Sequence, residues 1–175
     1  MAVREAPPIE TERLLLRAYR IEDFPIYVTA WADPRTVRYI SGRTFTEEES
    51  WGRFLRNIAL WPMLGFGYWA IEEKSSGRYV GDIGFADFKR EMEPSVQGIP
   101  EMGWVLAPET HGRGYATEAG RAALAWGESQ WGSKRVVCMI DPDNEPSLNV
   151  ARKLGFTPVL NTHYKDFPTI LLTRG

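Results

Sequence analysis

The chain has 175 residues, of which 43% are hydrophobic and 25% charged, and its formal net charge is −2. This suits one globular domain, residues 1–175, and gives no basic surface that would indicate nucleic acid or an acidic membrane as a partner. The one cysteine, Cys138, excludes an internal disulfide framework and is expected to be a packing residue. There is no apolar N-terminal core and no run of about 20 apolar residues, so we expect a cytoplasmic protein without a membrane segment.

The N-terminal third predicts a strand followed by two helices. The strand covers residues 11–19 around three consecutive leucines, and a short helix follows over residues 22–31. The dipeptide Asp33–Pro34 breaks this helix. The next helix opens at Thr46–Glu49, which is a capping box by its spacing, and Pro62 is expected to end it.

The middle of the chain predicts three strands. Gly67–Glu73 and Tyr79–Phe88 are joined by a hairpin connection, Lys74–Arg78. A polar loop, Lys89–Gly98, then leads into an apolar run, Met102–Leu106, which is flanked by prolines and is typical of a buried strand.

The turn Gly112–Ala116 opens the longest predicted helix. Small and apolar residues recur along that helix to Trp131 at the helical period, which gives a face able to lie close to a sheet. Two glycines permit backbone torsions closed to other residues, and the unpaired amides at a helix start favour an anion. The segment is therefore either an ordinary glycine-rich turn or, with the help of Arg113, a site for a diphosphate.

The last third predicts a strand, a short helix and two closing strands. The strand is Arg135–Ile140, the helix is Asn144–Leu154, and the closing strands are Phe156–Tyr164 and Thr169–Thr173. Together the elements predict an α+β domain with a mixed, mainly antiparallel sheet.

Three segments of the chain resemble one known family. His-Gly-Arg-Gly-Tyr-Ala-Thr-Glu-Ala, residues 111–119, resembles the acyl-CoA pyrophosphate loop of the GNAT acetyltransferase superfamily, in particular its ribosomal-protein N-acetyltransferase-like (RimJ/RimL-type) branch. Asn144–Phe156 looks like that branch's second signature, and Thr11–Arg17 is similar to its usual first strand. The resemblance covers nearly the whole chain. It implies a GNAT-like sheet of roughly six to seven strands flanked by about four helices, acetyl-CoA as cosubstrate, and no metal.

The resemblance also implies which residues bind the cosubstrate. The diphosphate would be held by Gly112, Arg113, Gly114, Tyr115, Ala116 and Thr117. The pantetheine arm would run along Trp104, Val105 and Leu106 and reach Asn144 and Ser147 on the next helix. Several of these residues have a simpler interpretation: Asn144 as a helix cap, Ser147 as a first-turn residue, Trp104 as core, and the neighbouring His111 as a plain loop residue.

The expected reaction is direct attack of a neutral amine on the acetyl thioester, with the oxyanion held by backbone donors near Val105. In many superfamily members a tyrosine seven positions after the Asn protonates the departing thiolate; here that position is Ala151, so Ser147, a water, or no residue supplies the proton. Glu101, at the head of the ligand-binding strand, is the first candidate base, and Asp87 is the reserve. Each has an alternative interpretation as a solvated surface carboxylate.

Two other functions stay open at this point. A non-catalytic CoA-binding module is one, because no motif assigns the acid and the base. A dinucleotide oxidoreductase is less favoured, because Thr117 replaces the third glycine and Asp141 comes later than a ribose-binding acid should. For an acetyltransferase, the acceptor is a protein N-terminal α-amine or a small-molecule amine. The chain is expected to be a monomer or a homodimer.

Overall fold

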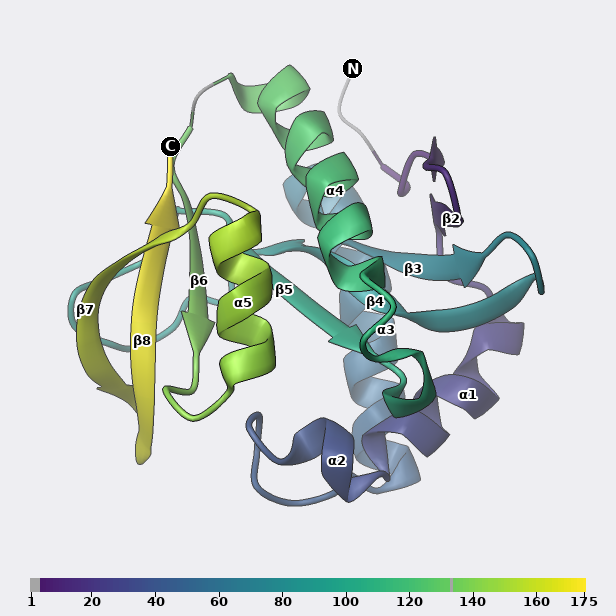
Figure 1. Cartoon of the computed structure of the whole chain (residues 1–175), viewed down its shortest axis with the longest axis horizontal. Helices are drawn as coiled ribbons and strands as arrows, with labels where there is room; N and C mark the ends of the chain where they lie inside the picture. Colours follow the sequence, from purple (N-terminus) through teal and green to yellow (C-terminus); the bar gives the residue numbers. More distant parts are fainter. Residues whose placement is uncertain (1–3, 133) are drawn as a thin grey trace.

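The computed structural model describes residues 4–132 and 134–175 and contains one mixed sheet of eight strands. The strand order is β1-β2-β3-β4-β5-β6-β8-β7, and β5 and β6 are the parallel pair (Figure 1). The strands are β1 (Ile9–Glu10), β2 (Leu14–Arg17), β3 (Tyr68–Glu73), β4 (Arg78–Ala86), β5 (Glu101–Leu106), β6 (Val136–Ile140), β7 (Thr157–Tyr164) and β8 (Phe167–Arg174).

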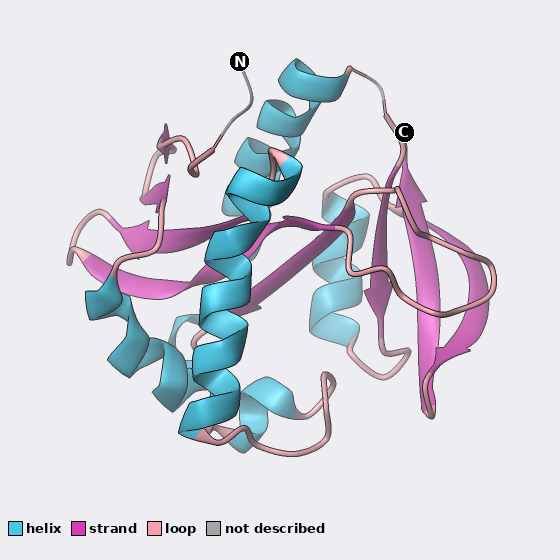
Figure 2. Cartoon of the chain, turned by 180° about the vertical axis from the view of Figure 1, so that it is seen from behind, coloured by secondary structure: helices cyan, strands magenta, loops and turns pink. Residues whose placement is uncertain are grey.

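Helices cover both faces of this sheet. They are α1 (Phe24–Trp31), α2 (Pro34–Val37), α3 (Glu47–Leu64), α4 (Tyr115–Trp131) and α5 (Glu145–Lys153). The helices α4 and α5 lie in front of the sheet in Figure 1, whereas α3 comes to the front in Figure 2, where the molecule is seen from behind. Within the described ranges, no helix combines the length and the apolar character needed to cross a membrane.

The α+β class and the mixed, mainly antiparallel sheet are confirmed, but the predicted numbers of elements are wrong. The described residues form eight strands rather than six to seven, and five α-helices rather than about four. The additional elements are the two-residue strand β1, which pairs with β2 through Ile9 and Leu16, and the four-residue helix α2. Both are too short to show a hydrophobic period, so pattern reading cannot find them.

The capping box at the start of α3 is present, but Pro62 does not end this helix. Thr46 Oγ1 accepts the Glu49 N–H at 3.2 Å, and Glu49 accepts the Thr46 N–H at 2.9 Å. Pro62 lies inside the last turn, where its missing N–H costs a single backbone hydrogen bond. The helix ends at Gly65, whose φ of 77° is left-handed and whose N–H donates to Trp61.

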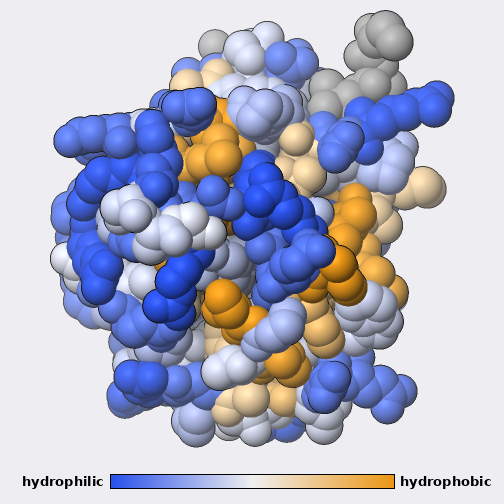
Figure 3. Space-filling view, turned by 90° about the vertical axis from the view of Figure 1, so that its right-hand side faces the viewer, coloured by the Kyte–Doolittle hydropathy of each residue, from blue (hydrophilic) through white to orange (hydrophobic). Residues whose placement is uncertain are grey.

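Apolar side chains on the two faces of the sheet form two main cores. Under α4 and α5, the core includes Trp69 and Phe85 of the central strands. On the opposite face, Tyr27 and Trp31 of α1 pack with Phe54 of α3 against β3 and β4. The central strands are therefore buried on both sides, and a charged residue on them is unusual. The face of the molecule shown in Figure 3 is mostly hydrophilic, with small apolar patches between the charged side chains.

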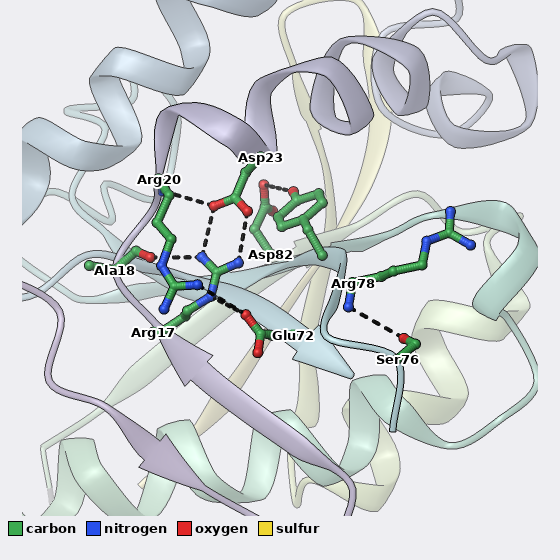
Figure 4. Close-up of polar contacts among 9 residues, drawn as sticks. Arg17, Ala18, Arg20, Asp23, Glu72, Ser76, Arg78 and Asp82 are labelled. Atoms are coloured by element: carbon green, nitrogen blue, oxygen red, sulfur yellow. Dashed lines mark hydrogen bonds and ion pairs between the residues drawn. The ribbon is translucent and has the colours of Figure 1, made fainter. Parts of the chain in front are cut away.

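Three charged side chains form a buried network where β2, β3 and the start of α1 meet (Figure 4). Arg17 donates two hydrogen bonds to Asp23, at 2.8 and 2.7 Å, and one to Glu72 at 2.7 Å. Arg17 and Asp23 are 6% and 4% exposed. The hydrogen bonds to Asp23 are the main reason that the pKa of the Arg17 guanidinium stays above its ordinary value despite burial. The network therefore contains a permanent buried charge whose compensation depends on both carboxylates.

We expect Asp23→Ala to lower the free energy of unfolding by about 3–5 kcal/mol, because it removes one partner of a buried ion pair and leaves the other behind. Chemical denaturation of the two proteins measures this. The control is Glu128→Ala, which removes a partly exposed pair with Arg174 and should change the free energy of unfolding by about 0–1 kcal/mol. Similar losses in the two variants would contradict the prediction.

Candidate functional site

The parallel strands β5 and β6 meet at one position and then diverge. Glu101 opposite Val137 is the one register pair between them in the described chain, and Figure 1 shows the two strands moving apart toward their carboxyl ends. Residues 102–106 of β5 thus have no strand partner on this side, and we call them the open β5 edge. Backbone groups on such an edge can pair with an extended ligand as with an added strand. The side chain of His111 lies at the carboxyl end of the open β5 edge, with its Nε2 2.9 Å from the Leu106 carbonyl oxygen.

The glycine turn stands at the end of this edge and starts α4. Gly112 and Gly114 have φ values of 75° and 79°, in the left-handed region that favours glycine. A Cβ on Gly112 would meet nothing within 4 Å and one on Gly114 only the end of the Arg13 side chain, so the torsion angles are what require glycine. Gly114 is the N-cap, and no side chain caps the helix. The amides of residues 115–117 therefore suit an anion such as a phosphate.

Side chains around the turn hold it to distant parts of the chain. Arg113 Nη1 lies 3.2 Å from Glu73 at the end of β3, and the Tyr115 hydroxyl donates to the same carboxylate. Arg113 is thus paired with β3, whereas the sequence predicted that it assists a diphosphate. Glu118 accepts a hydrogen bond from the Thr11 hydroxyl at 2.6 Å, across 107 residues of sequence. Sequence reasoning missed this role, since a partner so far along the chain has no local signal.

Across the gap where β5 and β6 diverge, Asn144 caps α5. Its Oδ1 accepts the Ser147 N–H at 3.2 Å, so the capping interpretation is confirmed, and contact of Asn144 with pantetheine stays a prediction. Ser147 is half-buried in the first turn of the helix. Ala151, where many relatives are expected to carry a tyrosine, is fully buried in the core beneath α4. Among these positions, Ser147 is the one that offers a hydroxyl.

The side chains of β5 alternate between the two faces of the sheet. Trp104 and Leu106 pack in the core under α4 and α5, whereas Val105 packs in the core beneath α1 and α3. By strand alternation, Glu101 and Gly103 point to the same side as Val105. We call this side the α3 face.

Both predicted bases already have partners. Glu101 is 7% exposed, so its interpretation as a solvated carboxylate is wrong. Arg90 Nε and Nη2 donate to its two oxygens at 2.6 and 2.7 Å, and this bidentate pair competes with any proton that the carboxylate might accept. Burial would raise the pKa of Asp87, but hydrogen bonds from Lys89 and from the Gly98 amide hold it below its ordinary value. As a weak base with two partners, Asp87 is poorly suited to deprotonate an amine.

A third carboxylate on the α3 face, Asp82 of β4, was not singled out from the sequence. It lies opposite Val105, and a register shift between β3 and β4 brings the Tyr79 hydroxyl to 3.4 Å from its Oδ2 (Figure 4). Asp82 is 2% exposed and has no ion-pair partner among the described residues. Burial raises its pKa to about 6, against the influence of Arg53. A sequence signal existed: Asp82 interrupts the otherwise uncharged run Tyr79–Phe85.

Tyr68 covers the middle of β5 on the same face. A Cβ on Gly103 would overlap the Tyr68 hydroxyl oxygen, so glycine allows the phenol to lie against the strand. Burial, reinforced by Glu101 and Asp82, raises the pKa of this phenol, which therefore stays protonated and able to donate a hydrogen bond. The α3 face of β5 thus brings together the phenols of Tyr68 and Tyr79 and two carboxylates, from three strands.

An open hollow of about 450 Å³ adjoins this group at the amino end of β5. It is lined by the loop between β4 and β5, through Arg90, Glu91, Met92, Glu93, Ser95 and Gln97. Because Arg90 also holds Glu101, the hollow borders the α3 face of β5. In the part of the chain that the structure describes, no three His, Cys, Asp or Glu side chains gather as a metal site.

Comparison with known proteins agrees with this geometry. Residues 13–157 match the family model described as the acetyltransferase (GNAT) domain. An uncharacterized protein of Bacillus subtilis (strain 168), YkkB, is 31% identical over 150 residues, which cover 83% of this chain and 82% of that protein.

Solved structures extend the likeness to nearly the whole chain. A putative GnaT-family acetyltransferase from Bordetella pertussis has a TM-score of 0.84 at 29% identity and covers 97% of this chain and 99% of that chain. RimL, a ribosomal L7/L12 alpha-N-protein acetyltransferase solved in complex with coenzyme A, has a TM-score of 0.76 at 18% identity, over 96% of this chain and 97% of that one. At that identity the likeness to RimL concerns the fold.

Proposed function

Because the chain belongs to the acetyltransferase (GNAT) family, we propose that it moves an acetyl group from acetyl-CoA to a primary amine by direct attack. RimL is among its structural neighbours, in agreement with the RimJ/RimL-like branch. The observation that carries the proposal is the open β5 edge, which ends at a turn with two left-handed glycines and the free amides of a helix start. All eight strands join one sheet, which supports a single domain over residues 1–175.

The residues present fit acetyl-CoA. The turn residues Gly112–Thr117 would take the diphosphate through backbone amides, and residues 104–106 would pair with the amides of the pantetheine arm. Asn144 and Ser147 stand at the start of α5 across the opening, and both remain candidates to contact that arm. The two ligand-binding roles are separate: a phosphate at the helix start and an extended chain along a strand edge.

We assign the base to Asp82, ahead of Glu101. An amine nitrogen that attacks the acetyl carbonyl carbon must lose a proton, the carbon–sulfur bond must break, and the thiolate must gain a proton. Asp82 lies opposite Val105, where the oxyanion donors are expected, and it has one long hydrogen bond in place of the bidentate pair that occupies Glu101. Being buried, it would accept the proton through the Tyr79 hydroxyl or one water.

The proton for the departing thiolate is assigned to Ser147 or to solvent. Ala151 cannot supply it, because a methyl group has no acidic proton, and this one is also buried in the core. A thiolate is a good leaving group near neutral pH, so an acid of modest strength is sufficient.

We expect α-amines to be acetylated faster than ε-amines near neutral pH. Deprotonating a lysine-like amine of pKa ~10.4 costs about 4.6 kcal/mol at pH 7, whereas an α-amine near pKa ~8 costs about 1.4 kcal/mol. The difference, about 3 kcal/mol, favours the α-amine whatever base accepts the proton. Initial rates on a peptide with a free N-terminus and no lysine, against the same peptide with a blocked N-terminus and one lysine, measure this. Equal or faster rates on the lysine would contradict it.

Release of the free CoA thiol across a panel of amines tests the proposed function. The panel includes peptide N-termini, free amino acids, polyamines and aminoglycosides. Turnover on at least one amine is the expected result. Binding of acetyl-CoA in calorimetry without turnover on any of them would instead support a non-catalytic CoA-binding module.

A further inference from the structure

Two arginines of α3, Arg53 and Arg56, have no carboxylate partner within residues 4–132 and 134–175. Arg53 is half-buried, with its Cζ 4.0 Å from the centre of the Trp31 ring, and its Nε is buried without a hydrogen-bond partner. Stacking on the ring satisfies the flat surface of the guanidinium but leaves the N–H groups at its rim free. Arg56 Cζ lies 4.8 Å from the centre of the Phe88 ring.

Both guanidinium groups belong to the α3 face beside β5. Arg53 and Arg56 both act on the buried Asp82 carboxylate and on the Tyr68 phenol by their charge. Arg56 shares the Phe88 ring with Arg90, the residue that holds Glu101. The two arginines are therefore next to Asp82, the residue proposed to take the proton from the acceptor amine.

The charges on this face do not balance. Arg90 is neutralised by Glu101, Arg17 by Asp23, and Arg20 by Glu72, which it shares with Arg17. What remains is two guanidinium groups against one carboxylate, Asp82, with which neither of them forms an ion pair. Arg56 is exposed on α3, and partial desolvation and repulsion from Arg53 lower its pKa.

A buried guanidinium N–H without a partner, such as Nε of Arg53, is costly unless a ligand supplies the anion. A carboxylate is the natural match, because its two oxygens fit the rim of a guanidinium. We propose that the acceptor carries a carboxylate close to its amine and that Arg53 and Arg56 bind it. This inference rests on the proposed function and names its substrate class. Polyamines and aminoglycosides, with several positive charges and no carboxylate, are poor acceptors for such a site.

Matched peptides test the inference without changing the amine. The dipeptide Ala-Ala is compared with Ala-Ala-amide, and Ala-Asp-Ala-amide with Ala-Asn-Ala-amide, so that a terminal and a side-chain carboxylate are examined separately. For at least one pair, we expect the carboxylate to raise kcat/KM by about 10- to 100-fold, the range for a hydrogen bond to a charged group. The double variant Arg53→Gln/Arg56→Gln should bring that ratio close to one, whatever its rate on the neutral peptide.

Three controls keep the result interpretable. Arg121→Gln removes an exposed arginine from α4, on the other face of the sheet, and should leave the ratio unchanged. Arg53→Lys/Arg56→Lys keeps the charges and should keep part of the ratio, which covers the case in which the glutamine variants do not fold. The binding of N-acetyl-Ala-Ala and its amide, measured by calorimetry, gives the same comparison without turnover.

The outcomes separate the inference from the proposed function. Equal rates on both members of each pair, a ratio that survives in the double glutamine variant, or a faster rate on spermidine would overturn the inference and leave acetyl transfer standing. Absence of turnover on every amine would overturn the proposed function. In that case calorimetry still tests the carboxylate site. Tighter binding of N-acetyl-Ala-Ala than of its amide, lost in the double glutamine variant, would support the site, and equal binding of the two would contradict it.

Discussion

Asp82→Asn is expected to lower kcat/KM by about 10²- to 10⁴-fold, the usual contribution of a general base. The substitution keeps the shape of the side chain and removes its ability to accept a proton. In the unmodified protein the rate should fall as the pH drops through about 6, because the Asp82 carboxylate becomes protonated. Protonation of the α-amine, with a pKa of ~8, slows both proteins over this range, so the variant should keep that slope and lack only the additional fall near pH 6. Rates between pH 5 and 8 on one α-amine acceptor measure both effects.

Stability separates a catalytic loss from a folding defect. The pKa of Asp82 is raised in the folded protein, so its protonated form is favoured there, and its contribution to stability is lost as pH rises through about 6. A neutral amide at this position should therefore not lower Tm at pH 7. The companion variant is Glu101→Gln, which should keep the fall in rate near pH 6. If Glu101→Gln removed that fall and Asp82→Asn kept it, the base would be Glu101.

Gly114→Val is expected to raise the KM for acetyl-CoA by about 10- to 100-fold. The diphosphate is proposed to bind the amides next to Gly114, and one charge-assisted hydrogen bond is worth roughly 1.5–3 kcal/mol. A branched side chain at this position would crowd an approaching phosphate and disfavour the φ of 79° that aims the amides. Initial rates at varied acetyl-CoA, with the acceptor held constant, give the KM.

Gly77→Val is the control for the effect of backbone strain alone. Gly77 has a φ of 66° in the β3–β4 hairpin, and a side chain there has open space. Both variants should lose stability by about 1–2 kcal/mol because a valine is forced into the left-handed region. The KM for acetyl-CoA should rise in the Gly114 variant alone. An unchanged KM in that variant would remove the phosphate role from this part of the turn.

Local chemistry explains what could be read from the chain. The capping box at Thr46, the cap at Asn144 and the glycines before α4 depend on residues within a few positions of one another, and the structure has each of them. The class of fold follows from the order of apolar patterns. Pro62 was misjudged because the helix continues past it to Leu64, at the cost of one backbone hydrogen bond.

The amino-acid sequence by itself determined the α+β class, the turn that suits a phosphate and the resemblance that points to acetyl transfer, because these depend on near neighbours and on ordered motifs. The tertiary structure alone decided that Arg90 is paired with Glu101 and that Asp82 is a buried acid opposite Val105. It also decided that Arg53 and Arg56 act on Asp82 without carboxylate partners of their own among the described residues. The partners of these groups come from other elements, and the sequence does not show which elements meet. Burial and charge partners set the acidity of a carboxylate, and both depend on how the sheet and α3 pack together.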